Sequence, residues 1–158
     1  KYDRAEFEKF AAYDAERAQQ LNQARIEFVD RHFKGKVLDI GIGCGLFVAG
    51  RPNTDGFDVN PHAVEWLRAR DRYCSDLGNY QAFTFWDVLE HIDAPEVYLR
   101  RVPHYGWVFA SIPVVDRLED VRESKHYKPG EHLYYFTVDG FVAWMRLSGF
   151  ELIERSEH

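Results

Sequence analysis

The residues best suited to chemistry lie in and after a short glycine-rich segment. Val37–Ile40 is a short apolar run typical of a buried strand, and Gly41, Gly43 and Gly45 follow it in the spacing G-x-G-x-G. Glycines in such a turn let the backbone approach a ligand where a Cβ atom would clash. Taken alone, the segment also fits an ordinary tight turn between a strand and a helix.

Two carboxylates indicate what kind of ligand this turn suits. Asp58 comes at the end of the next predicted strand, where a carboxylate can accept two hydrogen bonds from ribose hydroxyls. A dinucleotide fingerprint needs a third glycine where this chain has Leu46. Asp39, two residues before the first glycine, suits a cationic group and disfavours a pyrophosphate. We therefore expect a ligand with a ribose and a positive charge, and S-adenosylmethionine carries both.

The elements that must position these residues alternate between strands and helices. Apolar residues at helical spacing over 4–33 predict one or two amphipathic helices ahead of the glycine turn. Asn60 followed by Pro61 is a strong helix start. Strands are predicted at 37–40, 54–59, 73–77, 82–88, 106–113 and 150–154, and further helices begin at Pro95 and Thr137. This alternation predicts a compact three-layer α/β/α fold around a doubly wound, mostly parallel sheet.

Bulk properties narrow the function classes. The 158 residues suit one domain overall, with an N-terminal helical extension at 1–34 and a cofactor-binding domain at 35–158. The net charge of −6 disfavours long nucleic acid as a partner. No apolar run approaches a membrane span, and two cysteines make no disulfide framework, so a cytoplasmic protein is expected. The N-terminal extension is expected over the pocket mouth, with Tyr13 closing over the cofactor.

Three motifs in order carry a family resemblance. They are Val-Leu-Asp-Ile-Gly-Ile-Gly-Cys-Gly at 37–45, Gly-Phe-Asp-Val-Asn-Pro at 56–61 and Phe-Trp-Asp-Val-Leu-Glu-His-Ile at 85–92. The chain resembles class I S-adenosylmethionine-dependent methyltransferases, in the subgroup with the ubiquinone-pathway O-methyltransferases. His-Leu-Tyr-Tyr-Phe-Thr at 132–137 and Ser-Gly-Phe-Glu-Leu at 148–152 are similar to the C-terminal half of that subgroup. The resemblance covers about residues 35–155.

The resemblance implies a role for each matching position. Asp39 and the backbone of Gly41, Gly43 and Gly45 would face the methionine end of the cofactor, and Asp58 would bind the ribose. The remaining cofactor contacts would be Val59 beside the adenine, Asp76 with Leu77 at the adenine edge, and Trp86 with Asp87 beside the methionine moiety. Two simpler interpretations stay open, because Asp76 also fits a turn cap and Trp86 also fits a core residue.

His91 and His132 are the predicted catalytic bases, should the acceptor be a hydroxyl or a protonated amine. His91 also fits a helix cap, and His132 also fits an anchor for the long loop at 114–132, whose charged part at 117–128 fits a solvated lid. Tyr134 and Tyr135 alternate on an extended stretch, so one could face the pocket and the other the core.

A divalent metal is not the first expectation, but one pattern allows it. Asp87, Glu90, His91 and His132 together could hold an ion that polarises a substrate oxygen. This arrangement is similar to sites in the ubiquinone-pathway O-methyltransferases and in the small-RNA 2′-O-methyltransferases, where the first position is commonly Glu.

The leading interpretation is methylation of an oxygen or nitrogen of a small molecule, with S-adenosylhomocysteine as product and hydroxyl acceptors favoured. The first crossover is short, the third-strand region is compressed and a seventh strand is missing from the pattern. These departures motivate an alternative, a scaffold or binding module with the same fold and no transfer. Methylation of RNA or protein is a second alternative, and it would require basic groups around the pocket.

Overall fold

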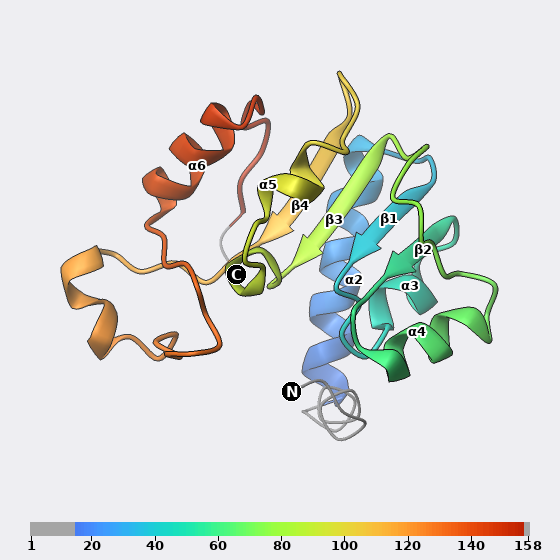
Figure 1. The fold of residues 1–158 in the computed structure, drawn as a ribbon, viewed down its shortest axis with the longest axis horizontal. Coiled ribbons are helices and arrows are strands. Elements are labelled where there is room, and N and C mark those ends of the chain that lie inside the picture. Colours follow the sequence, from blue (N-terminus) through green and yellow to red (C-terminus); the bar gives the residue numbers. More distant parts are fainter. Residues whose placement is uncertain (1–14, 157–158) are drawn as a thin grey trace. The chain divides into compact units, whose positions relative to one another are not determined.

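The computed structural model describes residues 15–156, which fall into two compact units (Figure 1). The first unit comprises the residues up to Trp86 together with 100–110, and the second comprises 87–99 together with the residues from Ser111 onward. Tyr13 and the first part of the expected N-terminal extension lie outside the described residues. The predicted boundary between residues 34 and 35 stays a prediction.

A four-stranded sheet organises the first unit, with the strand order β2-β1-β3-β4. The strands are β1 (Val37–Ile40), β2 (Thr54–Phe57), β3 (Ala82–Trp86) and β4 (Trp107–Ser111). β1 pairs in parallel with both β2 and β3, which places Asp39 opposite Gly56 on one side and Thr84 on the other. The predicted parallel α/β sheet is confirmed, and its centre is almost wholly buried.

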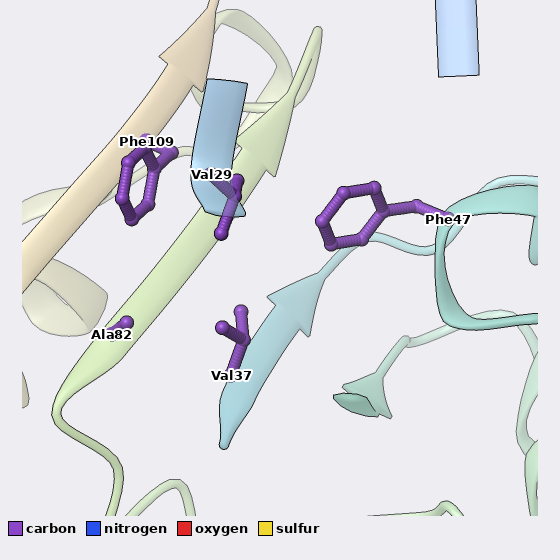
Figure 2. Close-up of a cluster of buried hydrophobic side chains, with 5 residues drawn as sticks. All are labelled: Val29, Val37, Phe47, Ala82 and Phe109. Atoms are coloured by element: carbon purple, nitrogen blue, oxygen red, sulfur yellow. The ribbon is translucent and has the colours of Figure 1, made fainter. Parts of the chain in front are cut away.

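Helices of the first unit pack against this sheet. They are α2 (Ala15–His32), α3 (Leu46–Gly50) and α4 (Pro61–Arg68). A buried cluster joins α2, α3 and three of the strands, and its members are Val29, Val37, Phe47, Ala82 and Phe109 (Figure 2). Burying each of the larger of these side chains contributes about 1.5–3 kcal/mol. α3 has five residues because the chain must return to β2 at once, as the short crossover predicts.

The start of α4 follows from its sequence. The side chain of Asn60 accepts a hydrogen bond from the backbone N–H of His62, and Pro61 occupies the first turn. The carboxylate of Asp58 in turn accepts a hydrogen bond from the backbone N–H of Asn60 at 2.8 Å. These bonds fix the chain between the end of β2 and the start of α4, as the Asn-Pro pair predicts.

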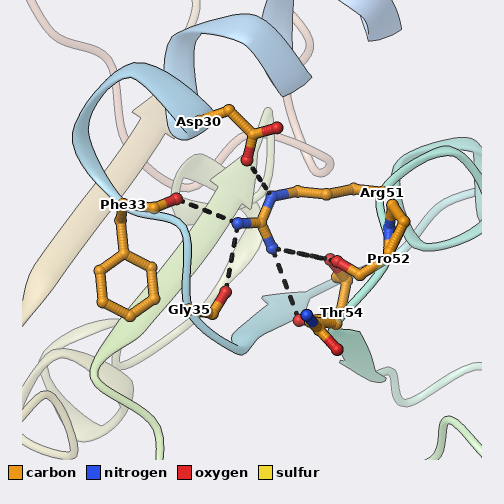
Figure 3. Close-up of polar contacts among 7 residues, drawn as sticks. Asp30, Phe33, Gly35, Arg51, Pro52 and Thr54 are labelled. Carbon is orange, nitrogen blue, oxygen red and sulfur yellow. Dashed lines mark hydrogen bonds and ion pairs between the residues drawn. The ribbon is translucent and has the colours of Figure 1, made fainter.

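A buried arginine ties the opposite end of the sheet together (Figure 3). Arg51 is 2% exposed and ends α3. Its guanidinium donates to Asp30 on α2 at 2.9 Å and to the hydroxyl of Thr54 at 3.3 Å. It also donates to the carbonyls of Phe33 and Gly35. The side chain thereby saturates most of its donors within the fold.

The second unit contains short helices and a long connection. Its elements are η1 (Leu89–His91), α5 (Glu96–Leu99), η2 (Leu118–Glu123) and α6 (Val138–Leu147). Thr137 caps α6 by accepting a hydrogen bond from the backbone N–H of Gly140, as predicted. No helix within 15–156 is long and apolar enough to cross a membrane.

Two predicted strands are wrong. Residues 73–77 keep only one isolated bridge, between Tyr73 and Gly56, and residues 150–154 carry no regular secondary structure. Both segments have apolar residues at suitable spacing. A strand also needs a neighbour for its backbone hydrogen bonds, and in the described residues neither segment forms a ladder.

Candidate functional site

The glycine turn follows β1, as predicted, and each of its three glycines has a backbone conformation that favours glycine. Gly41, Gly43 and Gly45 have φ values of 73°, 54° and 80°, in the left-handed region that favours glycine. A Cβ on Gly45 would lie 2.7 Å from the ring of Trp66, whereas one on Gly43 would meet nothing within 4 Å. The turn is therefore packed against α4 at its third glycine and open at its second, where a ligand can approach the backbone.

An open cleft of about 620 Å³ lies at the carboxyl end of β2. Asp58 and Val59 line it, together with one face of α4 and the ring of Tyr73. Val59 is 59% exposed, so the cleft presents apolar surface that the fold leaves uncovered. The position agrees with the general rule that parallel sheets bind ligands beyond the carboxyl ends of their strands.

Asp39 is more deeply buried than a ligand-facing carboxylate need be. It is 1% exposed, and one carboxyl oxygen accepts a 2.6 Å hydrogen bond from the hydroxyl of Thr84. Burial raises the pKa of Asp39 to about 8, while the hydrogen bond from Thr84 and the positive charge of Arg25 act in the opposite direction. A cationic ligand end nearby would favour the ionised form.

Trp86 ends β3 and combines the two roles considered for it. Its ring packs edge-on against Phe47 in the core cluster, with ring centroids 5.3 Å apart. The guanidinium of Arg25 from α2 lies 5.0 Å from the ring centroid. The buried indole Nε1 has no hydrogen-bond partner among the described residues. Trp86 is thus a core residue with one polar atom left open.

Asp76 and Leu77 are placed apart from the cleft lining. Asp76 is exposed, and Leu77 has a φ of 42°. Neither is among the residues that line the cleft, whose wall on this side is Tyr73. The predicted contact of these two residues with an adenine edge stays a prediction.

The second unit brings together Glu90, His91 and His132. One ligand atom from each lies within 4.8 Å of the others. Glu90 is 1% exposed, and one of its carboxyl oxygens has no hydrogen-bond partner among the described residues. The backbone carbonyl of Glu90 accepts a 2.7 Å hydrogen bond from the N–H of Leu133, which holds the end of the long loop against η1.

The two imidazoles of this cluster differ in their hydrogen bonding. Nδ1 of His91 lies 2.9 Å from the carbonyl oxygen of Glu131. In the tautomer with the proton on Nδ1, the ring donates a hydrogen bond to this carbonyl, and Nε2 keeps its lone pair. Nδ1 of His132 has no hydrogen-bond partner among the described residues. This pattern is typical of metal-binding histidines.

Electrostatics in the cluster also suit neutral imidazoles beside a carboxyl group. Burial lowers the pKa of His132, and the neighbouring charges of His91 and Lys128 lower it further. Burial raises the pKa of Glu90 to about 7, and the nearby Asp87 adds to this rise. Bringing a cation to these groups would offset the cost of burying the carboxylate.

Other predicted residues of the second unit lie outside this triad. Asp87 is exposed, has a φ of 56°, and donates its backbone N–H to Ser111. The hydroxyl of Tyr134 donates to the carbonyl of Asp93 at 2.6 Å. The ring of Tyr135 lies 5.9 Å from that of His132. Of the two tyrosines, Tyr135 is therefore the neighbour of the cluster.

Sequence reasoning missed Arg25, Thr84 and Tyr73. Arg25 carried a readable signal, because it lies four residues after Leu21 and three before Phe28 on the apolar side of its helix. A charged side chain on the apolar side of a helix needs a partner that compensates its burial. Thr84 and Tyr73 gave no comparable signal, because their roles depend on neighbours far away in the sequence.

Comparisons with known proteins agree with this geometry. A family model described as a methyltransferase domain matches residues 10–155. No curated protein matches the sequence.

Three solved structures share the fold. A SAM-dependent methyltransferase from Thermotoga maritima has a TM-score of 0.63 at 17% identity, over 92% of this chain and 80% of its own. The methyltransferase domain of bacterial CtHen1-C has a TM-score of 0.58 at 20% identity, over 83% and 82%. The [4+2]-cyclase SpnF has a TM-score of 0.61 at 18% identity, over 87% and 58%. The third shows that this fold also occurs in a protein described by another reaction.

Proposed function

The chain belongs to the methyltransferase-domain family, and on that premise we propose that it transfers the methyl group of S-adenosylmethionine to an oxygen or nitrogen of a small molecule. The observation that carries the proposal is the cleft beyond β2, which Asp58 lines; the glycine turn after β1 also leaves open space at Gly43. A hydroxyl acceptor is favoured, because two imidazoles and a buried carboxyl group lie in the second unit.

The residues present fit this cofactor. Asp58 offers carboxylate oxygens to ribose hydroxyls, and Val59 offers apolar surface to the base. Gly41, Gly43 and Gly45 let the backbone come close to the methionine end. Bound S-adenosylmethionine supplies an activated methyl group on a good leaving group, so the protein mainly aligns the acceptor and excludes water.

The methionine end is a zwitterion, and the first unit holds a carboxyl group and a guanidinium for it. The positive charge of Arg25 acts against the burial that raises the pKa of Asp39, and Arg25 also lies over Trp86. We assign Asp39 to the ammonium side, acting from beneath the turn, and Arg25 to the carboxylate side. Because Asp39 is buried, we treat it as a positioning residue.

A divalent cation at Glu90, His91 and His132 is the second part of the proposal. It is favoured by the open oxygen of Glu90 and the open Nδ1 of His132, both buried. Such an ion would polarise an acceptor oxygen and lower the pKa of its hydroxyl group. Without it, His91 or His132 would take the acceptor proton directly as a general base.

Calorimetry with S-adenosylmethionine and S-adenosylhomocysteine tests the cofactor assignment. We expect wild type to bind both ligands and Asp58→Asn to bind at least about tenfold more weakly, or about 1.4 kcal/mol. Asp71→Asn is the matched control, because Asp71 is an exposed acid of the same unit outside the cleft. Absence of binding at high micromolar ligand would favour a scaffold module instead.

Metal use has its own test. Isothermal titration with Mn²⁺ and Mg²⁺ should show one site in wild type and none in His132→Ala. An acceptor screen with S-adenosylhomocysteine release as readout should then lose activity on chelation and regain it with either ion. Activity that is indifferent to a chelator would leave the general-base alternative.

A further inference from the structure

The four strands of the first unit begin at one edge of the sheet, which we call the amino edge. Val37 pairs with Ala82 and donates its N–H to the carbonyl of Asn53 at 2.9 Å. Trp107 donates its N–H to the carbonyl of Gln81 at 2.7 Å, which brings the start of β4 beside that of β3. The arrow tails of β1, β3 and β4 mark this edge in Figure 1. The segments that lead into the four strands are 31–36, 52–53, 79–81 and 100–106, all in the first unit.

The amino edge is positively charged, although the chain as a whole is acidic. Its four segments contain five Lys or Arg and no Asp or Glu, in a chain with 20 Lys and Arg, 26 Asp and Glu and a net charge of −6. The five cations are all exposed, and they are Arg31, Lys34, Lys36, Arg100 and Arg101. Lys34, Arg100 and Arg101 have no ion-pair partner among the described residues.

The acids in neighbouring segments do not cancel this charge. Asp30 accepts a hydrogen bond from Arg51 at 2.9 Å, and Asp55 forms an ion pair with Lys36 at 2.6 Å. The exposed Asp76 follows the isolated bridge to β2, at the opposite side of the sheet from β4. Uncompensated positive charge therefore remains at the amino edge, above all next to the start of β4.

Tyr105 adds an exposed aromatic ring to this edge. Gly106 donates its N–H to the carbonyl of Pro103 at 2.8 Å, which closes a tight turn with Tyr105 as its third residue. Tyr105 has a φ of 65° where such turns favour Gly or Asn, and it is 92% exposed. The ring of His104 lies edge-on beside it, with ring centroids 4.3 Å apart. Backbone strain of this kind is common at binding sites, and Tyr105 gains nothing from burial in return.

This combination of side chains suits an acidic surface of another protein. Arg and Tyr are enriched among the residues that dominate the free energy of protein–protein binding. A long nucleic acid suits the edge less well, because the acidic remainder of the chain would repel it. An anionic bilayer also suits it less well, since Tyr105 is the one exposed large apolar side chain in these four described segments.

We propose that the amino edge binds an acidic segment of a partner protein through Lys34, Arg100, Arg101 and Tyr105. The cleft beyond β2 lies at the carboxyl end of the strands, so the partner would not compete with a ligand in that cleft. The proposal does not depend on the cofactor assignment.

Fluorescence anisotropy with the full chain tests this proposal. The probe is a labelled peptide that repeats Glu-Glu-Phe three times, and wild type should bind it at one saturable site, more weakly as salt is added. Arg100→Ser/Arg101→Ser should weaken binding at least about tenfold. The control Arg17→Ser/Arg70→Ser removes two exposed cations elsewhere in the same unit and should change the affinity less than about twofold. Equal weakening by the two double variants would reveal unspecific attraction and overturn the proposal.

Tyr105→Gly separates recognition from stability. Glycine relieves the positive φ, so the thermal midpoint of unfolding should rise while the Glu-Glu-Phe peptide binds about threefold more weakly. Binding of a peptide that repeats Glu-Glu-Ser should stay unchanged, because it has no apolar side chain to pack on the ring. Unchanged binding of the Glu-Glu-Phe peptide would overturn the role of Tyr105, whatever the change in stability.

Two further probes test the class of partner. Labelled oligouridylate and phosphatidylserine vesicles are also anionic, and both should bind at least about fivefold more weakly than the Glu-Glu-Phe peptide. Tighter binding of either probe, lost in Arg100→Ser/Arg101→Ser, would overturn the protein partner in favour of RNA or a membrane. Absence of binding by all three probes at low salt would overturn the proposal altogether.

Discussion

Arg51 and Glu90 are both buried charged residues, yet their surroundings differ. Arg51 donates to a carboxylate, a hydroxyl and several carbonyls, so its burial is compensated within the fold. Glu90 is as deeply buried but keeps one carboxyl oxygen without a partner among the described residues. Compensated burial fits a structural role. Uncompensated burial beside two imidazoles fits a group that awaits a ligand.

Among the tests of this difference, removal of the Arg51 side chain should have the largest effect. Arg51→Met should lower the free energy of unfolding by about 3–5 kcal/mol, because it removes a buried side chain and leaves Asp30 and two half-buried carbonyls without their donor. Urea denaturation measures it. Arg70→Met is the control, since Arg70 is exposed and lies over Trp66, and should cost at most about 1 kcal/mol. Equal losses of unfolding free energy in Arg51→Met and Arg70→Met would contradict the structural role of the buried Arg51.

Asp39 lies between these two cases, with one hydrogen bond from Thr84 and a pKa raised to about 8. The unfolded chain ionises this carboxyl near its ordinary pKa of 3.8, whereas the folded chain keeps the proton until about pH 8. The free energy of unfolding should therefore fall as pH rises from about 4 to 8, by at most about 1.4 kcal/mol per pH unit.

Asp39→Asn should remove this component, and it keeps an acceptor for Thr84. Urea denaturation of wild type and variant at pH 5 and pH 8 measures the effect. The variant should gain stability relative to wild type at the higher pH. A difference between the two proteins that stays constant across this range would show that Asp39 does not titrate within it.

Two glycines of the turn differ in a similar way, because Gly45 packs against a side chain and Gly43 faces open space. Gly45→Ala should cost more stability than Gly43→Ala, because both positions have positive φ but only Gly45 would also strike Trp66. We expect about 1–3 kcal/mol at each for the backbone, with a further loss at Gly45. Thermal unfolding compares the pair. Loss of cofactor binding without extra loss of stability would mark Gly43 as the ligand-facing position.

The smallest stability effect is expected at Glu90. Glu90→Gln should change the free energy of unfolding of the metal-free protein by less than about 1 kcal/mol, since the amide keeps the shape and avoids a buried charge. The same change should abolish stabilisation by Mn²⁺ in a thermal-shift assay. A loss as large as that of Arg51→Met would place Glu90 with the structural charges.

Local signals in the sequence predicted the local structure well. Val37–Ile40 is a strand that leads into the glycine turn, and Asn60 and Thr137 cap their helices, as predicted. Each of these features depends on a few neighbouring residues. The residues at 73–77 and 150–154 also have apolar spacing, but a strand is completed only by a partner elsewhere in the chain.

The residues of the candidate site also divide into those with a local signal in the sequence and those that depend on distant neighbours. Asp58 was predicted from its place after a strand, and it lines the cleft. Asp87, Glu90, His91 and His132 were predicted as a pattern of ligand types, and the last three of them lie together. Tyr73 and Arg68 were not found, because their contact depends on how the compressed third strand folds back onto β2. Long-range packing of this kind leaves little periodic trace in a sequence.

Helix α2 holds the first crossover at both ends. Asn22 donates to the carbonyl of Leu46 at the start of α3, and Asp30 accepts from Arg51 at its end. Each partner supplies one of the two donors, so the crossover that directly follows the glycine turn is anchored to α2 at both of its ends.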